Sequence, residues 1–128
     1  MLAPKRAADL KRFMAVFIGK ATAEAKAAWS EQDPGVRAEI EAKGMAAWGA
    51  WMTRNADSIV DPGAPLGKTL RASADGIAET RNDLTAYIIV QAPSHAAAAQ
   101  LFDQHPHFAI FPGDSVEIIE VLPIPGAR

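Results

Sequence analysis

The chain contains no cysteine in its 128 residues. This absence excludes disulfide bonds and thiolate chemistry, and it is typical of a protein that works in the cytoplasm. A surplus of charge is also lacking, because the formal net charge is only −2. A nucleic-acid-binding protein would need a basic face, so we expect no nucleic acid partner. No run approaches the roughly 18 apolar residues of a membrane span, so we expect no membrane association.

What is present is the composition of an ordinary globular protein. Hydrophobic residues make up 49% of the chain and charged residues 22%, which is enough apolar material to bury a core. The length suits one domain, which we place at residues 10–128. Residues 1–9 are polar and alanine-rich and contain Pro4, so we expect them to be a disordered extension.

The clearest strand signal lies between Leu84 and Ala92, in a run rich in Thr, Tyr, Ile and Val. Alternation sends one set of side chains toward helices and the other set toward the opposite face of the sheet. The first set is uniformly apolar, and the second mixes apolar and polar groups, as the wall of a cavity or a dimer interface does. The first set is Leu84, Ala86, Ile88 and Val90, and the second is Thr85, Tyr87, Ile89 and Gln91.

Two further elements follow this strand. Ser94 is a suitable N-cap for a short alanine-rich helix. Pro106 ends that helix, because the residue before a proline avoids helical geometry. Residues 107–114 are expected to form a loop, with Pro112-Gly113 as its turn. A closing strand covers Val116 to Leu122.

The first half of the chain predicts a unit of the same kind. A strand over Lys11 to Gly19 puts Phe13 and Phe17 on one face. A short helix is expected over Thr22 to Ser30, because that segment has a helical composition.

A long helix follows. Asp33-Pro34 supplies an N-cap and a proline at the first helical position, and the helix continues to about Asn55. Gly44 and Gly49 inside it mark places where something packs closely against the backbone, or they are merely tolerated. The segments before Leu84 are then a loop, a strand and a hairpin turn, over Asp61–Gly67, Lys68–Ala78 and Glu79–Asp83.

The predicted order is strand, helix, strand, hairpin, strand, helix, strand, which is the α+β, ferredoxin-like βαββαβ order. An antiparallel sheet of this type buries one face under helices, and its other face needs water or a partner. We expect that other face to carry Phe13, Phe17, Tyr87 and Ile89. Apolar groups on an uncovered face indicate a homodimer with the two sheets face to face.

Five segments make the chain resemble the YCII-related proteins, a family of dimeric α/β barrels with a ferredoxin-like fold. The segments are AAWGAWM (46–52), VDPGAPLGKT (60–69), RNDLTAYIIVQA (81–92), HPHF (105–108) and SVEIIEVLPIPG (115–126). The resemblance implies a homodimer whose sheets enclose a cavity. Some members look like small lyases or dehalogenases that act on aromatic compounds, with a suspected His-Asp pair. This chain departs from them, because its three histidines all lie from His95 onward and none is near the first strand.

His105 and His107 are the candidate acid–base residues, because imidazole exchanges protons near neutral pH. Asp61 or Asp114 could orient one of them. In the structural alternative, His105 caps the carboxyl end of the preceding helix and His107 bonds to loop backbone. The His-x-His spacing supplies two ligands where a catalytic zinc site takes three, so we expect neither a metal nor another cofactor.

Further side chains are candidates for ligand binding. Trp48 and Trp51 lie three apart on the long helix, where they either pack in the core or line a pocket. Tyr87 and Gln91 lie on the predicted inner face of the dimer, where they either contact a ligand or fill the interface. Asp61 is either a proton carrier at the cavity mouth or part of an Asp-Pro-Gly turn.

Two functions therefore stay open. One is a small cofactor-independent enzyme, lyase- or dehalogenase-like, that acts on a small aromatic or acidic molecule. His107 would be its base, and Tyr87 or Asp61 would assist. The other is a non-catalytic homodimer that binds a small molecule or a protein. The enzyme hypothesis predicts a pocket reached by His107 and a carboxylate within hydrogen-bonding range of its imidazole.

Overall fold

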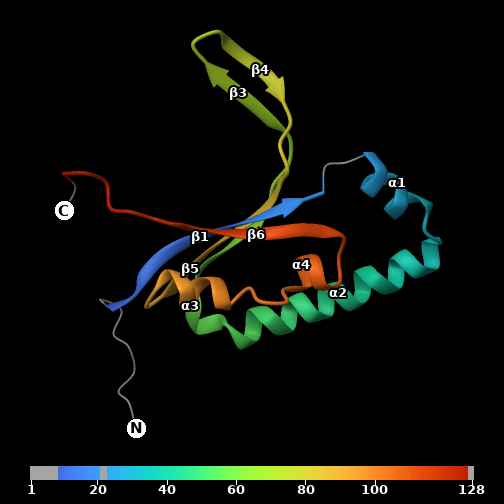
Figure 1. Cartoon of the computed structure of the whole chain (residues 1–128), viewed down its shortest axis with the longest axis horizontal. Helices are drawn as coiled ribbons and strands as arrows, with labels where there is room; N and C mark the ends of the chain where they lie inside the picture. Colours follow the sequence, from blue (N-terminus) through green and yellow to red (C-terminus); the bar gives the residue numbers. More distant parts are fainter. Residues whose placement is uncertain (1–8, 21–22, 127–128) are drawn as a thin grey trace.

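A computed structural model of the chain describes residues 9–20 and 23–126, so most of the predicted N-terminal extension, residues 1–8, lies outside the described residues. The main element is a four-stranded sheet in which every pair is antiparallel (Figure 1). Its order, β2-β5-β1-β6, is that of a ferredoxin-like sheet. The bounds are Lys11–Gly19 for β1, Ile59–Pro65 for β2, Leu84–Ala92 for β5 and Gly113–Glu120 for β6.

Helices cover one face of this sheet. α2, α3 and α4 all lie on the same side of it, and the other side, which we call the open face, carries none of these three helices (Figure 1). The architecture is therefore α+β, an antiparallel sheet with helices, consistent with the ferredoxin-like fold that the sequence predicts. The helices are α1 (Ala23–Glu31), α2 (Pro34–Arg54), the 3-10 helix η2 (Ala56–Ser58), α3 (His95–Gln100) and α4 (Pro106–Ala109).

Both predicted N-caps are confirmed. The carboxylate of Asp33 accepts hydrogen bonds from the backbone N–H groups of Gly35 and Val36, at 3.0 and 3.3 Å. Ser94 Oγ accepts from the N–H of Ala97 at 3.1 Å, at the start of α3. These side chains satisfy N–H groups that have no partner within their helix, which is why capping residues locate helix starts so well.

The facing of β1 differs from the prediction. Phe13 and Phe17 are 2% and 0% exposed and pack under the helices, so their predicted place on the open face is wrong. Directly opposed residues of an antiparallel pair share a face, and Phe17 lies opposite Ala86 of β5. Alternation separates the two sets of side chains in a strand, but only the register with a neighbouring strand decides which set is buried. The open face of β1 carries Met14, Val16 and Ile18.

The connection between α2 and β5 also differs. Residues 61–65, predicted as loop, belong to β2, which pairs irregularly with β5. The single strand predicted over residues 68–78 is instead a hairpin of two strands, β3 and β4, which pair with each other. Ala74 and Asp75 make the bend between the paired residues Ser73 and Gly76, with Gly76 at φ 104°, so the hairpin turn predicted at Glu79–Asp83 is also wrong. The bounds are Thr69–Ser73 for β3 and Gly76–Thr80 for β4.

We expect Gly63→Ala to destabilise the fold by roughly 1–3 kcal/mol. Gly63 has φ 68°, and a Cβ atom there would overlap the backbone carbonyl of Tyr87 in the neighbouring strand. Gly67→Ala is the matched control, because position 67 has open space around it and only a small surface effect is expected. Urea unfolding followed by tryptophan fluorescence measures both variants. Equal unfolding midpoints would contradict the close approach of β2 to β5.

Candidate functional site

A cavity of about 440 Å³ lies on the helix side of the sheet, between α2, β2, β5 and α4. Its walls are mostly apolar and include the aromatic residues Phe17, Trp48 and Phe111. His107, from α4, brings an imidazole into this wall. The cavity therefore combines flat apolar surfaces with a group that can exchange a proton.

His107 is held in one orientation by a hydrogen bond to the sheet. Its Nε2 atom lies 2.7 Å from the carbonyl oxygen of Ile18, near the end of β1. A carbonyl oxygen only accepts, so Nε2 carries the hydrogen, and the neutral imidazole has its lone pair on Nδ1. Among the hydrogen bonds of the described residues, none uses Nδ1 of His107. In the neutral ring, Nδ1 is therefore an acceptor without a hydrogen-bond partner among the described residues.

The end of β1 is shaped for this hydrogen bond. The pairing of β1 with β5 shifts register between Phe17 and Ile18, and the pairing with β6 shifts between Ile18 and Gly19. An irregular ladder leaves a backbone carbonyl available to a side chain. Gly113 gives the imidazole its room, because a Cβ atom at that position would overlap Cε1 and Nε2 of His107.

His105 lies at the start of a helix rather than at the end of one. It is the N-cap of α4, where its Nδ1 accepts the backbone N–H of His107 at 3.0 Å, and Pro106 is the first residue of that helix. The predictions that Pro106 ends a helix and that His105 caps a carboxyl end are therefore wrong. Proline is favoured at the first helical position, and α3 already ends at Gln100.

The imidazole of His105 is fully buried in an aromatic cluster. Its ring centroid lies 4.6 Å from that of Trp48 and 4.8 Å from that of Trp51, both in T-shaped contacts. Because Nδ1 accepts a hydrogen bond, Nε2 carries the hydrogen in the neutral ring, and Nε2 is buried without a hydrogen-bond partner in the described residues. An N–H group that faces an aromatic ring makes a weak hydrogen bond, which the T-shaped contacts permit.

The charge state of His105 follows from this surrounding. Burial, and after it the neighbouring His107, lowers the pKa of His105 to about 4. The ring is therefore uncharged at neutral pH, and it is not part of the cavity wall. This geometry gives His105 a supporting position beneath His107, and its acid–base role stays a prediction.

The predicted carboxylate partners lie elsewhere. Asp61 is exposed, and its Oδ1 accepts the backbone N–H of Gly63 at 2.8 Å, as in an Asp-Pro-Gly turn. Asp114 accepts a hydrogen bond from a neighbouring serine hydroxyl at 2.8 Å. Within the described part of the chain, the hydrogen-bond partner of the His107 ring is a backbone carbonyl and not a carboxylate. The geometry that the enzyme hypothesis requires is thus met for the pocket and not for the carboxylate.

The third histidine lies away from the cavity. His95 Nδ1 is 3.3 Å from a carboxylate oxygen of Glu120, and both side chains are exposed. Across residues 9–20 and 23–126, no three His, Asp or Glu side chains group closely enough to hold a metal ion. The helices in the same ranges are all too short or too polar to span a membrane.

The four residues predicted to bind a ligand lie in different places in the structure. Trp48 is half-buried and borders the cavity, and Tyr87 borders it as well. Trp51 is 2% exposed, and its Nε1 donates to a backbone carbonyl after α3 at 2.7 Å, as a core residue does. Gln91 donates to a backbone carbonyl of η2 at 3.1 Å and lies outside the cavity wall. The fold therefore brings Trp48 and His107 together at the cavity, whereas the side chain of Tyr87, directly opposite Val16, lies on the open face.

Two wall residues, Phe111 and Met45, were not among the sequence candidates. A signal for Phe111 was present in α2, where a Cβ atom at Gly44 would overlap the Phe111 ring. Gly44 is thus a position where another residue packs closely against the helix backbone, which confirms the first of the two interpretations given for it. Gly49 faces open space, and the same interpretation does not apply there.

Comparison with known proteins bears on the fold. No protein-family model and no curated protein matches the chain. Among solved structures, it is similar to 5-chloro-2-hydroxyhydroquinone dehydrochlorinase (TftG) from Burkholderia phenoliruptrix AC1100, in complex with 2,5-dihydroxybenzoquinone. The TM-score is 0.51 at 13% identity, over 91% of this chain and 99% of that chain. At this identity the likeness shows a shared fold alone.

We expect His105 to make the fold less stable in acid. Its pKa is about 4 in the folded state against an ordinary 6.5, so the unfolded chain takes up a proton first as the pH falls. The free energy of unfolding should therefore drop between about pH 6.5 and pH 4, by on the order of 3 kcal/mol from this group. His105→Asn keeps a capping acceptor and removes the titration.

Urea unfolding at about pH 7 and about pH 4.5 measures the effect. The stability advantage of the wild type over His105→Asn should shrink as the pH falls, whereas the control Gly67→Ala, which removes no titratable group, should lose stability in parallel with the wild type. If the wild type and His105→Asn lost stability in parallel, His105 would not be held neutral by burial.

Proposed function

We propose that this chain binds a small hydroxylated aromatic molecule in the cavity beside His107, which serves as its acid–base group. The observation that carries the proposal is the hydrogen bond from Nε2 of His107 to the carbonyl of Ile18. It leaves Nδ1 as the basic nitrogen of a residue in the wall of a cavity that aromatic side chains line.

The cavity favours a flat apolar body with a polar edge. Its volume of about 440 Å³ suits a small molecule. A ligand ring that packs against the walls gains roughly 0.5–1.5 kcal/mol per aromatic pair beyond its burial. An unprotonated Nδ1 accepts a hydrogen bond, so it favours a ligand that carries an acidic hydroxyl group. A phenol or a hydroxyquinone combines both properties.

The structural neighbour supports this ligand class. TftG is described in complex with 2,5-dihydroxybenzoquinone, a flat ring with two hydroxyl groups. A shared fold at 13% identity does not transfer a ligand from one protein to another. The agreement matters because the aromatic walls and the basic nitrogen of this chain point independently to the same chemistry.

Proton transfer is the reaction step that His107 could perform. Its Nδ1 would take the proton of the ligand hydroxyl as a general base and return it later as a general acid. The enzyme would then be cofactor-independent and lyase- or dehalogenase-like. The carbonyl of Ile18 orients the imidazole, but it adds no negative charge to stabilise the imidazolium, as a carboxylate would. This missing negative charge is the observation that supports a second candidate function, a non-catalytic module that binds the same molecule.

We also propose a homodimer with the open faces of two sheets in contact, as in the YCII-related proteins that the sequence resembles. The open face is rich in apolar side chains by its strand register. The open face also carries two opposite charges. Arg12 lies at one end of β1, and Glu117 of β6 lies opposite Val16, four residues farther along, which is roughly 13 Å from Arg12 along the strand direction. A two-fold axis between them would place each charge near its opposite on the second copy. The apolar residues are Met14, Ile18, Tyr87, Ile89, Ile119 and Val121, and Val16 on the same face is already buried within one copy.

Calorimetric titration with 2,5-dihydroxybenzoquinone tests the proposal. We expect binding by the wild type and about tenfold weaker binding by His107→Gln, because an amide can replace the hydrogen bond to Ile18 but is not a base. The control His95→Gln should bind as the wild type does, since His95 is exposed and lies outside the cavity wall. Histidine nitrogen NMR of the free protein should show His107 protonated at Nε2.

The same preparation separates the two candidate functions. Chloride release from 5-chloro-2-hydroxyhydroquinone would support the enzyme, and binding without turnover would leave the non-catalytic module. Equal affinities of the wild type and His107→Gln would remove His107 from the site. No binding of hydroxylated benzenes or quinones up to about millimolar concentration would reject the ligand class altogether.

A further inference from the structure

A two-stranded ribbon, residues 69–80, stands off the main sheet, and we call it the arm. β3 and β4 form a sheet of their own, and the arm rises on the side of the main sheet that faces away from α2, α3 and α4 (Figure 1). An isolated hairpin is at best marginally stable in water. An arm of this kind therefore needs another surface to cover it.

The two faces of the arm differ in chemistry. Leu70 lies opposite Glu79 and Ala72 opposite Ile77, so the two large apolar side chains share one face. Leu70 is 67% exposed and Ile77 is 76% exposed. On the other face, the guanidinium of Arg71 donates to a threonine hydroxyl of β4 at 3.3 Å. One face is thus suited to water, and the other presents apolar area to it.

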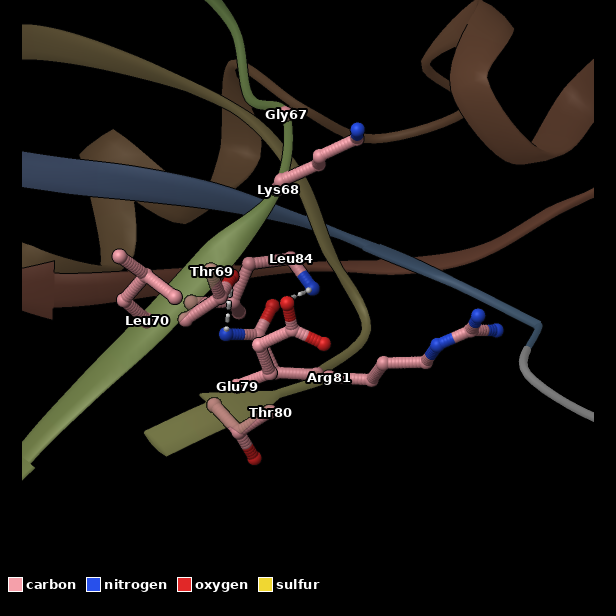
Figure 2. A pocket seen from close by; sticks show the side chains of 9 residues that line it. Gly67, Lys68, Thr69, Leu70, Glu79, Thr80, Arg81 and Leu84 are labelled. Atoms are coloured by element: carbon pink, nitrogen blue, oxygen red, sulfur yellow. Dashed lines mark hydrogen bonds between the residues drawn. The ribbon is translucent and has the colours of Figure 1, made fainter. Parts of the chain in front are cut away.

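Hydrogen bonds at the root hold the arm to the sheet. The side-chain amide of Asn82 donates to Thr69 Oγ1 at 3.3 Å and accepts from the backbone N–H of Leu84 at 3.0 Å (Figure 2). Just after β2, the backbone N–H of Leu66 donates to the carbonyl of Thr85 in β5 at 2.9 Å. The direction of the arm is therefore set by its root, and its apolar face is presented in a defined place.

We propose that the arm is a clasp that lies against a second copy of this chain and buries Leu70 and Ile77 on it. The inference rests on the proposed homodimer and extends it. The arm rises on the open side of the sheet, so a copy that covers Ile89 and Ile119 lies beside the arm. The opposite charges of the open face, which match under two-fold symmetry, favour a second copy of this chain over an unrelated partner. In such a dimer both arms are buried at once.

Sedimentation equilibrium of the full chain tests the clasp. The double variant Leu70→Thr/Ile77→Thr places a β-branched residue at both strand positions and removes apolar area from one face. We expect its dimer dissociation constant to rise at least tenfold. The matched control is Ala78→Thr, on the opposite face of β4, and it should leave the constant unchanged.

Tryptic cleavage of the wild type provides a second measurement that needs no variant. Arg71 lies within the arm, so cleavage after it should be slow at high protein concentration and faster on dilution into the monomer range. The clasp is overturned if the wild type dimerises, the double variant has the same dimer dissociation constant, and cleavage does not depend on protein concentration. That outcome would leave the sheet-to-sheet dimer valid. A wild type that stays monomeric at all concentrations overturns both the dimer and the clasp.

Discussion

The hydrogen bond from His107 to the carbonyl of Ile18 ties α4 to the first strand across 89 residues of sequence. Several local features meet at this bond. The ladder of β1 is irregular on both sides of Ile18, Gly113 leaves space for the ring, and the N-cap by His105 starts the turn that carries His107. The bond fixes which imidazole nitrogen is basic, and the proposed chemistry of the cavity depends on that assignment.

Two histidines only two residues apart have different roles because their surroundings differ. His105 lies among aromatic rings, where a charge has no solvation, and its pKa is low for that reason. His107 borders a cavity, and within the described part of the chain its ring makes one hydrogen bond, from Nε2 to a backbone carbonyl. The first residue supports the second through the backbone, because its Nδ1 accepts the N–H of His107.

β5 serves both surfaces of the molecule. Ala86 and Ile88 face the helices and border the cavity, and the alternate residues, among them Ile89, face the open side. Ligand chemistry is therefore proposed beneath the sheet, within one copy of the chain. Assembly is proposed on the open side, where the arm also rises (Figure 1). This differs from a cavity enclosed between two sheets, which the resemblance implied.

The sequence by itself determined the elements whose signals are local. Asp33 and Ser94 cap helices wherever those helices pack, because a cap bonds to N–H groups two or three residues away. The alternation in β5 was also interpretable, since its two sets of side chains differ clearly in polarity. These signals led to the ferredoxin-like fold, although the second strand of the main sheet is β2 and not the segment predicted over residues 68–78.

Only the tertiary structure decided the features that depend on distant partners. Both faces of β1 are apolar, so alternation alone could not tell which face lies under the helices. The register with β5, which places Phe17 opposite Ala86, decides it. The bond between His107 and Ile18 joins a side chain to a backbone carbonyl, and a carbonyl leaves no mark in a sequence. The cavity likewise depends on Phe111 packing against Gly44 of another element. Such contacts arise from packing between segments far apart in the chain, which neither periodicity nor turn chemistry encodes.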